Sequence, residues 1–467
     1  MRRVLATCLA AAWLAMPAVA LDNKTIAHQI DSIVKNTLPA GTEAAIAVWD
    51  MAADTAVYLL SQDVLCRPAS TMKVLTSYCA LSTLGANYSF DTKVCATGQI
   101  GADGTLDGDL YIIGGFDPEL MESDLKRLVQ ELYDKGLRRI SGKVIADVSA
   151  MDSVYWGSGW VWDDTPSSFQ PYVSPLMCHG GFVGVSLKPG VKGGAASVTV
   201  IPESKYYSID NRARTSDSKA GPVKVTRDWL HNGNTIIVTG NVTKAQSTEL
   251  NLFDSDKFTF CLFTEYLQKQ GITFNGTDWA TCPGNAKELV RASHSLKYVM
   301  KEALKESKNL NAECLFLQAA RSRYPKDISF EKAAKYMTDF YKRALKNQTR
   351  PFNVADGSGL SVYDYIPAQM FIDVLRLIYS QQETFDIIYD CMPINGYDGT
   401  LRGRMIAKPL AGKVHAKTGS VTGACTLSGY ATGADGRLLG FAILNQGAVT
   451  MSASRKVQDA ICTVLCQ

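Results

Sequence analysis

Ser70 and Lys73 are the first residues of this chain whose types and spacing could do chemistry. They lie three positions apart in the stretch RPASTMKVLT, so on a helix their side chains share one face, about one turn apart. Pro68 suits the start of a helix, and a serine at that point meets the positive end of the helix dipole. Lys73 could then accept the proton of the Ser70 hydroxyl and make it a nucleophile. The alternative is a capped surface helix with an ordinary lysine, because S-x-x-K spacing occurs by chance in many chains.

Two later stretches contain residues that such a serine would need. KESKNLNAE places Ser307 and Asn309 at a break between two helical patterns, and VHAKTGSVTG places the K-T-G run 417–419 on a predicted strand. Each motif alone is weak. The ordered set S-x-x-K, S-x-N and K-T-G is typical of penicillin-binding proteins and class A β-lactamases. The sequence therefore predicts an enzyme that forms an acyl-enzyme on serine.

Each motif residue has an expected role. The Ser70 hydroxyl attacks a carbonyl carbon, and Lys73 accepts its proton if nearby cations such as Lys417 lower the pKa of Lys73. Which group is the base in such enzymes is disputed. Ser307 can pass the proton to the leaving amine. Asn309 can hold the substrate amide and orient Lys73.

The K-T-G strand is expected to bind the substrate. Lys417 adds positive field for a substrate carboxylate, and the hydroxyls of Thr418 and Ser420 can bind that carboxylate. Gly419 lets the strand approach the substrate closely. The backbone N–H groups of Ser70 and Ser420 would form the oxyanion hole.

A serine–histidine triad does not fit this sequence. None of the five histidines (His28, His179, His231, His294 and His415) sits beside a G-x-S-x-G elbow, and Ser358 in ADGSGLS lacks the first glycine of that motif. His415 lies two residues before Lys417 and shares its strand face. We expect it to be an edge or buried structural histidine.

The first twenty residues predict an exported protein. MRRVLATCLAAAWLAMPAVA has a basic start, an apolar run and a small-residue end, which is the pattern of a signal peptide cleaved after Ala20. The apolar run is too short for a spanning helix, and we expect no integral membrane segment elsewhere. The predicted location is the periplasm.

Charge and cysteine content exclude several classes of protein. Losing Arg2 and Arg3 leaves 46 basic against 45 acidic residues, so we expect neither a nucleic acid nor a strongly acidic partner. Eleven of the twelve cysteines follow the signal, and we expect buried thiols plus a few disulfides. Cys178-His179 and Cys462/Cys466 lack the remaining spacing of a zinc site. We therefore expect no metal and no other cofactor.

The elements that must position the motifs predict an α/β fold. A helix from Asn23 to Leu38, a hairpin over 44–60 and the nucleophile helix from Ser70 to about Leu84 open the chain. Glycine-rich turns, a helix and a strand follow from about Tyr88. Residues 180–250 contain short β runs, with a hairpin turn at Asn232-Gly233. Because helices return from about Cys282, the middle is predicted to be inserted into one α/β domain.

The motifs and several further stretches resemble one family. RPASTMKVLTSYCALSTLG, LYIIGGFDPEL, GKVIADVS, GWVWDD, DGSGLS and KTGSVTGACTLSGY are similar to segments of class C penicillin-binding proteins, the type-4 D-alanyl-D-alanine carboxypeptidases/endopeptidases (peptidase S13 family). This resemblance implies a transpeptidase/β-lactamase-like domain, an antiparallel sheet flanked by helices, with an inserted α/β domain and a nested small all-β domain. The predicted limits are 1–20 for the signal peptide, 21–87 and 283–467 for the catalytic domain, 88–178 and 252–282 for domain II, and 179–251 for domain III.

The same resemblance implies the reaction and the partners. It implies cleavage of the D-Ala–D-Ala bond of peptidoglycan stem peptides, or of D-Ala–diaminopimelate cross-links, with β-lactams as inhibitors; a homo-oligomer is left open. Asp163 matches the acidic residue that binds the free amino end of the substrate side chain, with Asp164 as its neighbour and a simple turn acid as the alternative. Val362 stands where some members have an arginine for the side-chain carboxylate, so that recognition is in doubt or uses another group.

Two alternatives to this peptidase stay open. A β-lactamase would need a glutamate that holds the deacylating water, and no convincing glutamate motif lies between Ser70 and Ser307. A non-catalytic relative that only binds peptidoglycan or β-lactams is disfavoured by the three intact motifs.

Overall fold

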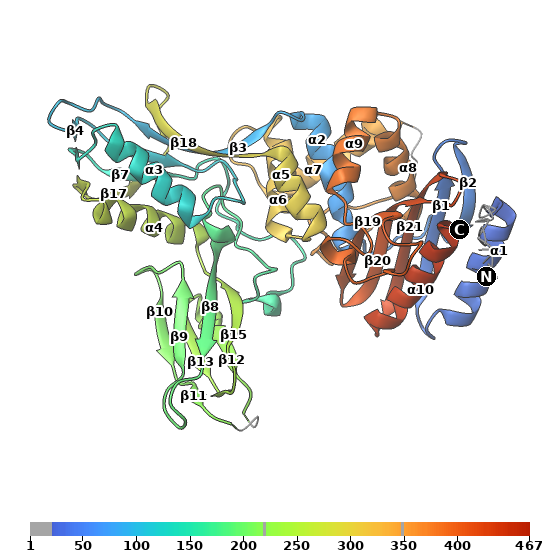
Figure 1. Cartoon of the computed structure of the whole chain (residues 1–467). Helices are drawn as coiled ribbons and strands as arrows, with labels where there is room; N and C mark the ends of the chain where they lie inside the picture. Colours follow the sequence, from blue (N-terminus) through green and yellow to red (C-terminus); the bar gives the residue numbers. More distant parts are fainter. Residues whose placement is uncertain (1–20, 218–220, 347–349) are drawn as a thin grey trace, which may run out of the picture.

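The computed structural model describes residues 21–217, 221–346 and 350–467 (Figure 1). The predicted signal peptide, residues 1–20, lies outside the described residues. Among the described residues, no helix combines the length and the apolar character that crossing a bilayer requires.

A five-stranded antiparallel sheet joins the two ends of the chain. Its order is β19-β20-β21-β1-β2, with β1 (Glu43–Asp50), β2 (Thr55–Leu60), β19 (Val414–Val421), β20 (Gly423–Thr432) and β21 (Leu438–Ala448). Helices α1 (Asn23–Thr37) and α10 (Met451–Leu465) lie against one face, and α8 (Ala368–Tyr379) lies against the other (Figure 1). The predicted α/β fold class is confirmed.

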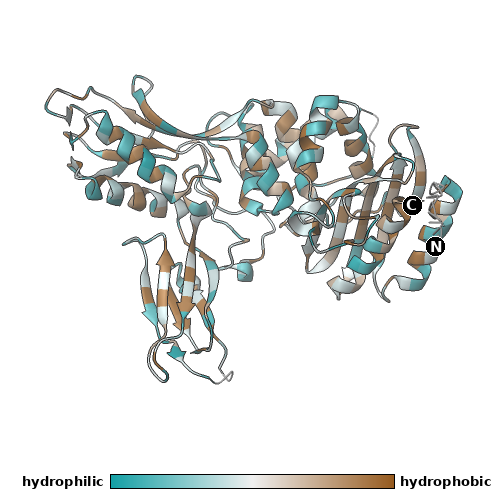
Figure 2. Cartoon of the chain, in the orientation of Figure 1, coloured by the Kyte–Doolittle hydropathy of each residue, from teal (hydrophilic) through white to brown (hydrophobic). Residues whose placement is uncertain are grey.

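Alternation along β1 explains why both faces are covered. Ile46 and Val48 pack into the core beneath α1 and α10, whereas Ala45 and Ala47 pack into the core on the opposite face. Successive side chains of a strand point to opposite sides, so this apolar strand requires a helical layer on each face. Figure 2 shows the corresponding pattern, with hydrophobic central strands and hydrophilic outer helix faces.

The nucleophile segment begins with a short 3-10 turn. The predicted helix from Ser70 is split into η1 (Ala69–Thr71) and α2 (Met72–Leu84). All residues from Met72 to Leu81 are buried, so α2 is a core helix and the surface-helix alternative is wrong. The surrounding helices are α5 (Leu296–Lys305), α6 (Asn309–Arg321), α7 (Phe330–Ala344) and α9 (Gln382–Cys391).

The chain leaves and re-enters this body along two paired strands. β3 (Ser89–Ala96) and β18 (Lys287–Ser295) run antiparallel and belong to a second sheet of order β17-β7-β5-β3-β18. Its other strands are β5 (Leu110–Ile113), β7 (Val144–Asp147) and β17 (Thr277–Trp279), and a small sheet contains β4 (Thr105–Leu106), β6 (Arg139–Ile140) and β16 (Thr273–Phe274). Helices α3 (Glu122–Asp134) and α4 (Ser255–Lys269) pack together beside it (Figure 1).

A unit of strands only lies within this insertion and projects from the body (Figure 1). It comprises β8 (Phe182–Lys188), β9 (Ser197–Ile201), β10 (Ser208–Asn211), β11 (Arg214–Thr215), β12 (Lys224–Arg227), β13 (Thr235–Thr239), β14 (Asn241–Val242) and β15 (Gln246–Asn251). The turn predicted at Asn232-Gly233 joins β12 to β13, but the connection also contains the 3-10 turn η4 (Trp229–His231). We call β8–β15 the nested β unit; the exact domain limits stay a prediction.

No disulfide joins the cysteines of the described residues. All eleven cysteines in the described ranges are free thiols, and nine of them are buried. The expectation of buried thiols is met, whereas the expected disulfides are absent from this part of the chain. The physical reason is that most of these side chains serve as small apolar residues within the cores.

Candidate active site

The turn that carries Ser70 is held from two sides. Pro68 O accepts hydrogen bonds from Thr71 Oγ1 (2.6 Å) and from Thr426 Oγ1 on β20 (2.7 Å). Ala69 has a φ of +46°, a conformation that costs free energy in a non-glycine residue and persists only where the surroundings impose it. The backbone of Gly359 lies directly against Ala69, because a Cβ at Gly359 would lie 1.8 Å from Ala69 O. The position of Ser70 is therefore set by tertiary contacts.

Lys73 lies directly behind Ser70 and is fully buried. Its Nζ donates to Ser70 Oγ (2.8 Å), Asn309 Oδ1 (2.7 Å) and Ser358 O (2.9 Å). These bonds use the three donors of an ammonium group. Burial lowers the pKa of Lys73 to about 8, although the negative charges of Asp356 and Glu313 act in the opposite direction.

A second buried lysine faces a second serine. Lys417 on β19 donates through Nζ to Ser307 Oγ (2.8 Å) and to Thr418 O (2.9 Å). Burial, and then the positive charge of Lys73, lowers the pKa of Lys417 well below its ordinary value. Burial is the largest cause at Lys73; because repulsion between two ammonium groups is mutual, the effect of Lys417 on the pKa of Lys73 stays a prediction.

Asn309 connects the site to the insertion. It is the first residue of α6, directly after the break at Ser307, whose φ is +62°. Its Oδ1 accepts from Lys73 while its Nδ2 donates to Phe169 O (2.7 Å). An amide nitrogen has two N–H donors, so Asn309 can bind a substrate carbonyl in addition.

The cleft beside Ser70 has a basic end. A hollow of about 640 Å³ is lined by Ser70, Ser307, Thr400, Gly403, Arg404, Thr418, Ser420, Ser452, Arg455, Lys456 and Asp459. Thr418 and Thr400 hydroxyls lie 2.8 Å apart. Arg404 is paired with Asp459 (2.6 Å), whereas Arg455 Nη2 reaches to 3.5 Å from Ser420 Oγ. Sequence patterns missed Arg455, because it lies on the last helix, far from any motif.

Gly419 brings the K-T-G strand against the nucleophile turn. A Cβ at this position would lie 2.1 Å from Thr426 Oγ1, 2.9 Å from Pro68 O and 3.0 Å from Ser70 N. No side chain fits there, which agrees with the predicted close approach of the strand.

Two buried carboxylates behind Lys73 were missed by motif reasoning. Glu313 accepts the backbone N–H groups of Gly357 and Ser358, both at 2.9 Å. Asp356 accepts from Gly359 N (2.6 Å) and from Trp160 Nε1 (2.8 Å). Burial and the charge of Asp356 raise the pKa of Glu313. Glu313 and Asp356 together shape the DGSGLS loop so that Ser358 O accepts a hydrogen bond from Lys73. The sequence feature that pointed to this loop was its resemblance to the family.

Asp163 lies apart from the other predicted site residues. It lies on the 3-10 turn η2 (Trp162–Asp164), it is exposed, and it does not line the cleft beside Ser70. Burial, and then the charge of Asp163, raises the pKa of Asp164. The segment that carries both aspartates contacts Asn309 through Phe169.

His415 is packed as a structural residue. Its ring stacks on Tyr389, with centroids 3.9 Å apart and planes at 10°. Burial lowers the pKa of His415.

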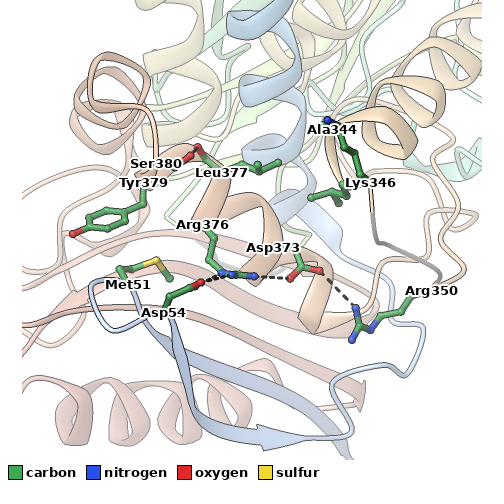
Figure 3. Close-up of a pocket in the computed structure, with 11 residues that line it drawn as sticks. Met51, Asp54, Ala344, Lys346, Arg350, Asp373, Arg376, Leu377, Tyr379 and Ser380 are labelled. Atoms are coloured by element: carbon green, nitrogen blue, oxygen red, sulfur yellow. Dashed lines mark hydrogen bonds and ion pairs between the residues drawn. The ribbon is translucent and has the colours of Figure 1, made fainter.

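Another cavity, of about 690 Å³, lies by α8 and holds none of the motif residues (Figure 3). Its arginines are engaged in ion pairs: Arg376 with Asp54 (2.6 Å) and Asp373 (3.8 Å), and Arg350 with Asp373 (3.7 Å). The cleft beside Ser70 is therefore the candidate active site.

Comparisons with known proteins agree on one family. The sequence profile of the D-Ala-D-Ala carboxypeptidase 3 (S13) family matches residues 26–467. A D-alanyl-D-alanine carboxypeptidase of Actinomadura sp. (strain R39) is 31% identical over 94% of this chain and 84% of its own length. D-alanyl-D-alanine carboxypeptidase DacB of Haemophilus influenzae is 28% identical over 84% of this chain and 83% of its own length. The crystal structure of penicillin binding protein 4 (dacB) from Haemophilus influenzae matches with a TM-score of 0.81 at 25% identity, covering 93% of this chain and 99% of that one.

Proposed function

The chain belongs to the D-Ala-D-Ala carboxypeptidase 3 (S13) family of serine carboxypeptidases, and we propose that it cleaves peptidoglycan stem peptides through an acyl-enzyme on Ser70. The observation that carries this proposal is the contact of 2.8 Å between Ser70 Oγ and the desolvated Nζ of Lys73. A lysine with a lowered pKa beside a hydroxyl is the arrangement that activates a serine nucleophile.

Acylation requires that Lys73 be neutral. Lys73 Nζ then accepts the Ser70 proton while Oγ bonds to the carbonyl carbon of the penultimate D-alanine. The backbone N–H groups of Ser70 and Ser420 stabilise the oxyanion. When the C–N bond breaks, the leaving amine takes a proton from Ser307 Oγ, which is resupplied by Lys417 at 2.8 Å. Water then hydrolyses the ester and releases the shortened peptide.

The basic end of the cleft binds the leaving group. Thr418 and Ser420 accept or donate through their hydroxyls, and Arg455 adds a guanidinium for the terminal carboxylate. The leaving group carries that carboxylate next to its amine both in a D-Ala–D-Ala terminus and in a D-Ala–diaminopimelate cross-link. The same cleft therefore serves carboxypeptidase and endopeptidase reactions, and β-lactams inhibit by acylating the same serine.

Export is part of this proposal. The composition of residues 1–20 supports a signal peptide, and peptidoglycan lies outside the cytoplasm. The mature chain would act in the periplasm. Asp163 would bind the amino end of the stem-peptide side chain.

Intact-mass measurement after brief benzylpenicillin treatment tests the acyl-enzyme. The wild-type protein should gain one penicilloyl group and Ser70→Ala none; the variant should fold, because Ser70 makes no side-chain cap bond in η1 or α2. Release of D-alanine from a stem pentapeptide should be lost in the same variant. Penicillin consumed without an adduct would indicate a β-lactamase. No adduct with intact penicillin would contradict the proposal and favour a non-catalytic relative.

A further inference from the structure

Two tryptophans from distant parts of the insertion pack together, the exposed Trp162 and the half-buried Trp229. Trp162 on η2 and Trp229 on η4 have ring centroids 5.3 Å apart and planes at 35°. Trp162 is 69% exposed, and Leu230, next to Trp229, is also 69% exposed. Single exposed apolar residues are ordinary, but a gathered aromatic surface marks a binding site.

A buried polar network holds this pair in place. Arg227 at the end of β12 is 1% exposed and donates to Asn251 O (2.9 Å) and to Tyr172 Oη (3.0 Å). Asn251 Nδ2 donates in turn to Gln170 O (2.7 Å). These hydrogen bonds join the segment that follows η2 to β12 and β15. Trp229 lies only two residues after Arg227, so the same contacts hold it near that segment. A surface ordered in this way binds without paying for ordering at the time of binding.

The aromatic pair is connected to the catalytic cleft. Trp162 belongs to the segment 162–170, and Phe169 in that segment accepts the hydrogen bond from Asn309 (2.7 Å). A stem peptide spans at most about 3.5 Å per residue, so whatever carries the stem must lie a short distance from Ser70. Phe169 satisfies that condition, because Asn309 contacts both Phe169 and Lys73, and Trp162 precedes Phe169 by seven residues in the same segment.

We propose that Trp162 and Trp229 form a platform that binds an N-acetylated amino sugar of the glycan strand from which the stem peptide extends. This inference rests on the proposed function. One face of a pyranose ring presents C–H bonds with partial positive charge, and the face of an indole carries negative potential. Asp163 and Asp228 are the chain neighbours of the two tryptophans; Asp228 Oδ1 is paired with His231 Nδ1 at 2.7 Å, so the exposed Asp163 is the carboxylate that can accept hydrogen bonds from sugar hydroxyl and amide groups.

The chemistry of the surroundings favours a sugar over a protein or a membrane. A protein partner needs about 800 Å² on each side, more than the exposed parts of Val161, Trp162, Phe169 and Leu230 present. The flanking carboxylates repel an anionic lipid surface. A sugar ring matches both the small apolar area and the polar rim.

Paired substrates test the platform. The first is a stem pentapeptide attached to its disaccharide, and the second is the same pentapeptide without sugar. We expect Trp162→Ala and Trp229→Ala each to lower kcat/KM for the sugar-linked substrate about fivefold and to change the free peptide by less than about twofold. Trp162→Phe should retain most of the wild-type kcat/KM for the sugar-linked substrate. Trp279→Ala removes an exposed indole from β17 and should change neither substrate.

Contrary outcomes are distinct. Equal losses on both substrates, or no loss on either, would overturn the platform, since the indoles would then act on the peptide or not at all. If the wild type cleaves neither substrate, the proposed function fails. The platform is then judged by tryptophan fluorescence titration with a sugar-only tetrasaccharide of alternating N-acetylglucosamine and N-acetylmuramic acid. A response that disappears in Trp162→Ala supports it, and the absence of a response in the wild type contradicts it.

Discussion

Two buried lysines, Lys73 and Lys417, each donate to a serine hydroxyl in the cleft. Removing an ammonium group from water disfavours its charged form, and two such groups near each other disfavour a second charge further. The repulsion favours one charged lysine at a time, so that a proton taken by one can be balanced by a proton given by the other. In the proposed mechanism, Ser70 and Ser307 are the groups through which that exchange reaches the substrate.

The pH dependence of acylation follows from Lys73. A base must be neutral to accept a proton, and the pKa of Lys73 is about 8. The rate constant for benzylpenicillin acylation should therefore rise with pH through about 8 as Lys73 becomes neutral. It should fall at higher pH, where Lys417, whose pKa lies well below its ordinary value, loses the proton that it passes through Ser307 to the leaving nitrogen. Stopped-flow or quenched-flow mass measurement between pH 6 and 10 checks this. A rate that is constant over that range would show that proton transfer to Lys73 does not limit acylation.

Arg455 should matter for substrates with a free terminal carboxylate. Arg455→Ala removes the guanidinium 3.5 Å from Ser420 Oγ, and a charge-assisted hydrogen bond is worth roughly 1.5–3 kcal/mol. We expect KM for a D-Ala–D-Ala peptide to rise about tenfold or more with little change in kcat, and we expect Arg455→Lys to recover part of the loss. The same peptide ending in an amide is the control. If Arg455→Ala raises KM for the amide substrate as much as it raises KM for the acid, Arg455 does not bind the carboxylate.

At the scale of single elements, close backbone approach defines the site. β19 lies so near the η1 turn that Gly419 admits no side chain, and the DGSGLS loop lies so near Ala69 that Gly359 admits none either. The oxyanion hole predicted from Ser70 N and Ser420 N depends on this contact. The site is therefore sensitive to the separation of β19 and η1 as well as to its polar groups.

Gly419→Ala should separate β19 from η1. The added methyl would lie 2.1 Å from Thr426 Oγ1 and 2.9 Å from Pro68 O, so the strand must shift. Overpacking of this kind costs about 1–3 kcal/mol of folding free energy, and we expect acylation to slow by about tenfold or more, since one lost oxyanion donor costs about that or more. Thermal unfolding and acylation rates measure the two effects.

Gly284→Ala is the matched control, because nothing lies within 4 Å of its added methyl. It should leave both quantities unchanged. A Gly419→Ala protein that acylates at the wild-type rate would show that the contact of β19 with η1 is not required.

These elements show what the sequence could predict. The motifs at Ser70, Ser307 and Lys417 could be found because each is a short local pattern, and α1, the β1–β2 hairpin and the K-T-G strand could be found because their apolar periodicity is local too. Glu313 and the positive φ of Ala69 could not, because both depend on contacts with residues far away in the chain. The disulfide expectation depends on contacts of the same kind, since Cys spacing does not reveal which thiols meet; Cys95 and Cys282, for example, pack in one small cluster although far apart in the chain.

At the scale of the whole molecule, the nested β unit is joined to the catalytic residues by a continuous set of contacts. On β15, Asn251 accepts a hydrogen bond from the buried Arg227 and donates one to the segment 165–170. That segment in turn accepts a hydrogen bond from Asn309 at Phe169 O. Asn309 then contacts Lys73. The insertion thus supports the position of the Asn309 amide, which a freely attached accessory domain would not do.

Asn251→Ala tests that connection. The change removes the side-chain bonds to Gln170 O (2.7 Å) and to Arg227, and an unsatisfied buried group costs about 1–3 kcal/mol. We expect a lower melting temperature and a slower benzylpenicillin acylation, although Asn251 lies on the nested β unit and does not line the cleft. Asn36→Ala, which removes one exposed hydrogen bond to Ser32, should change neither. Acylation at the wild-type rate in a destabilised Asn251→Ala protein would show that the nested β unit stabilises the fold without positioning Asn309, because the contacts from Asn251 to Asn309 would then be dispensable for catalysis.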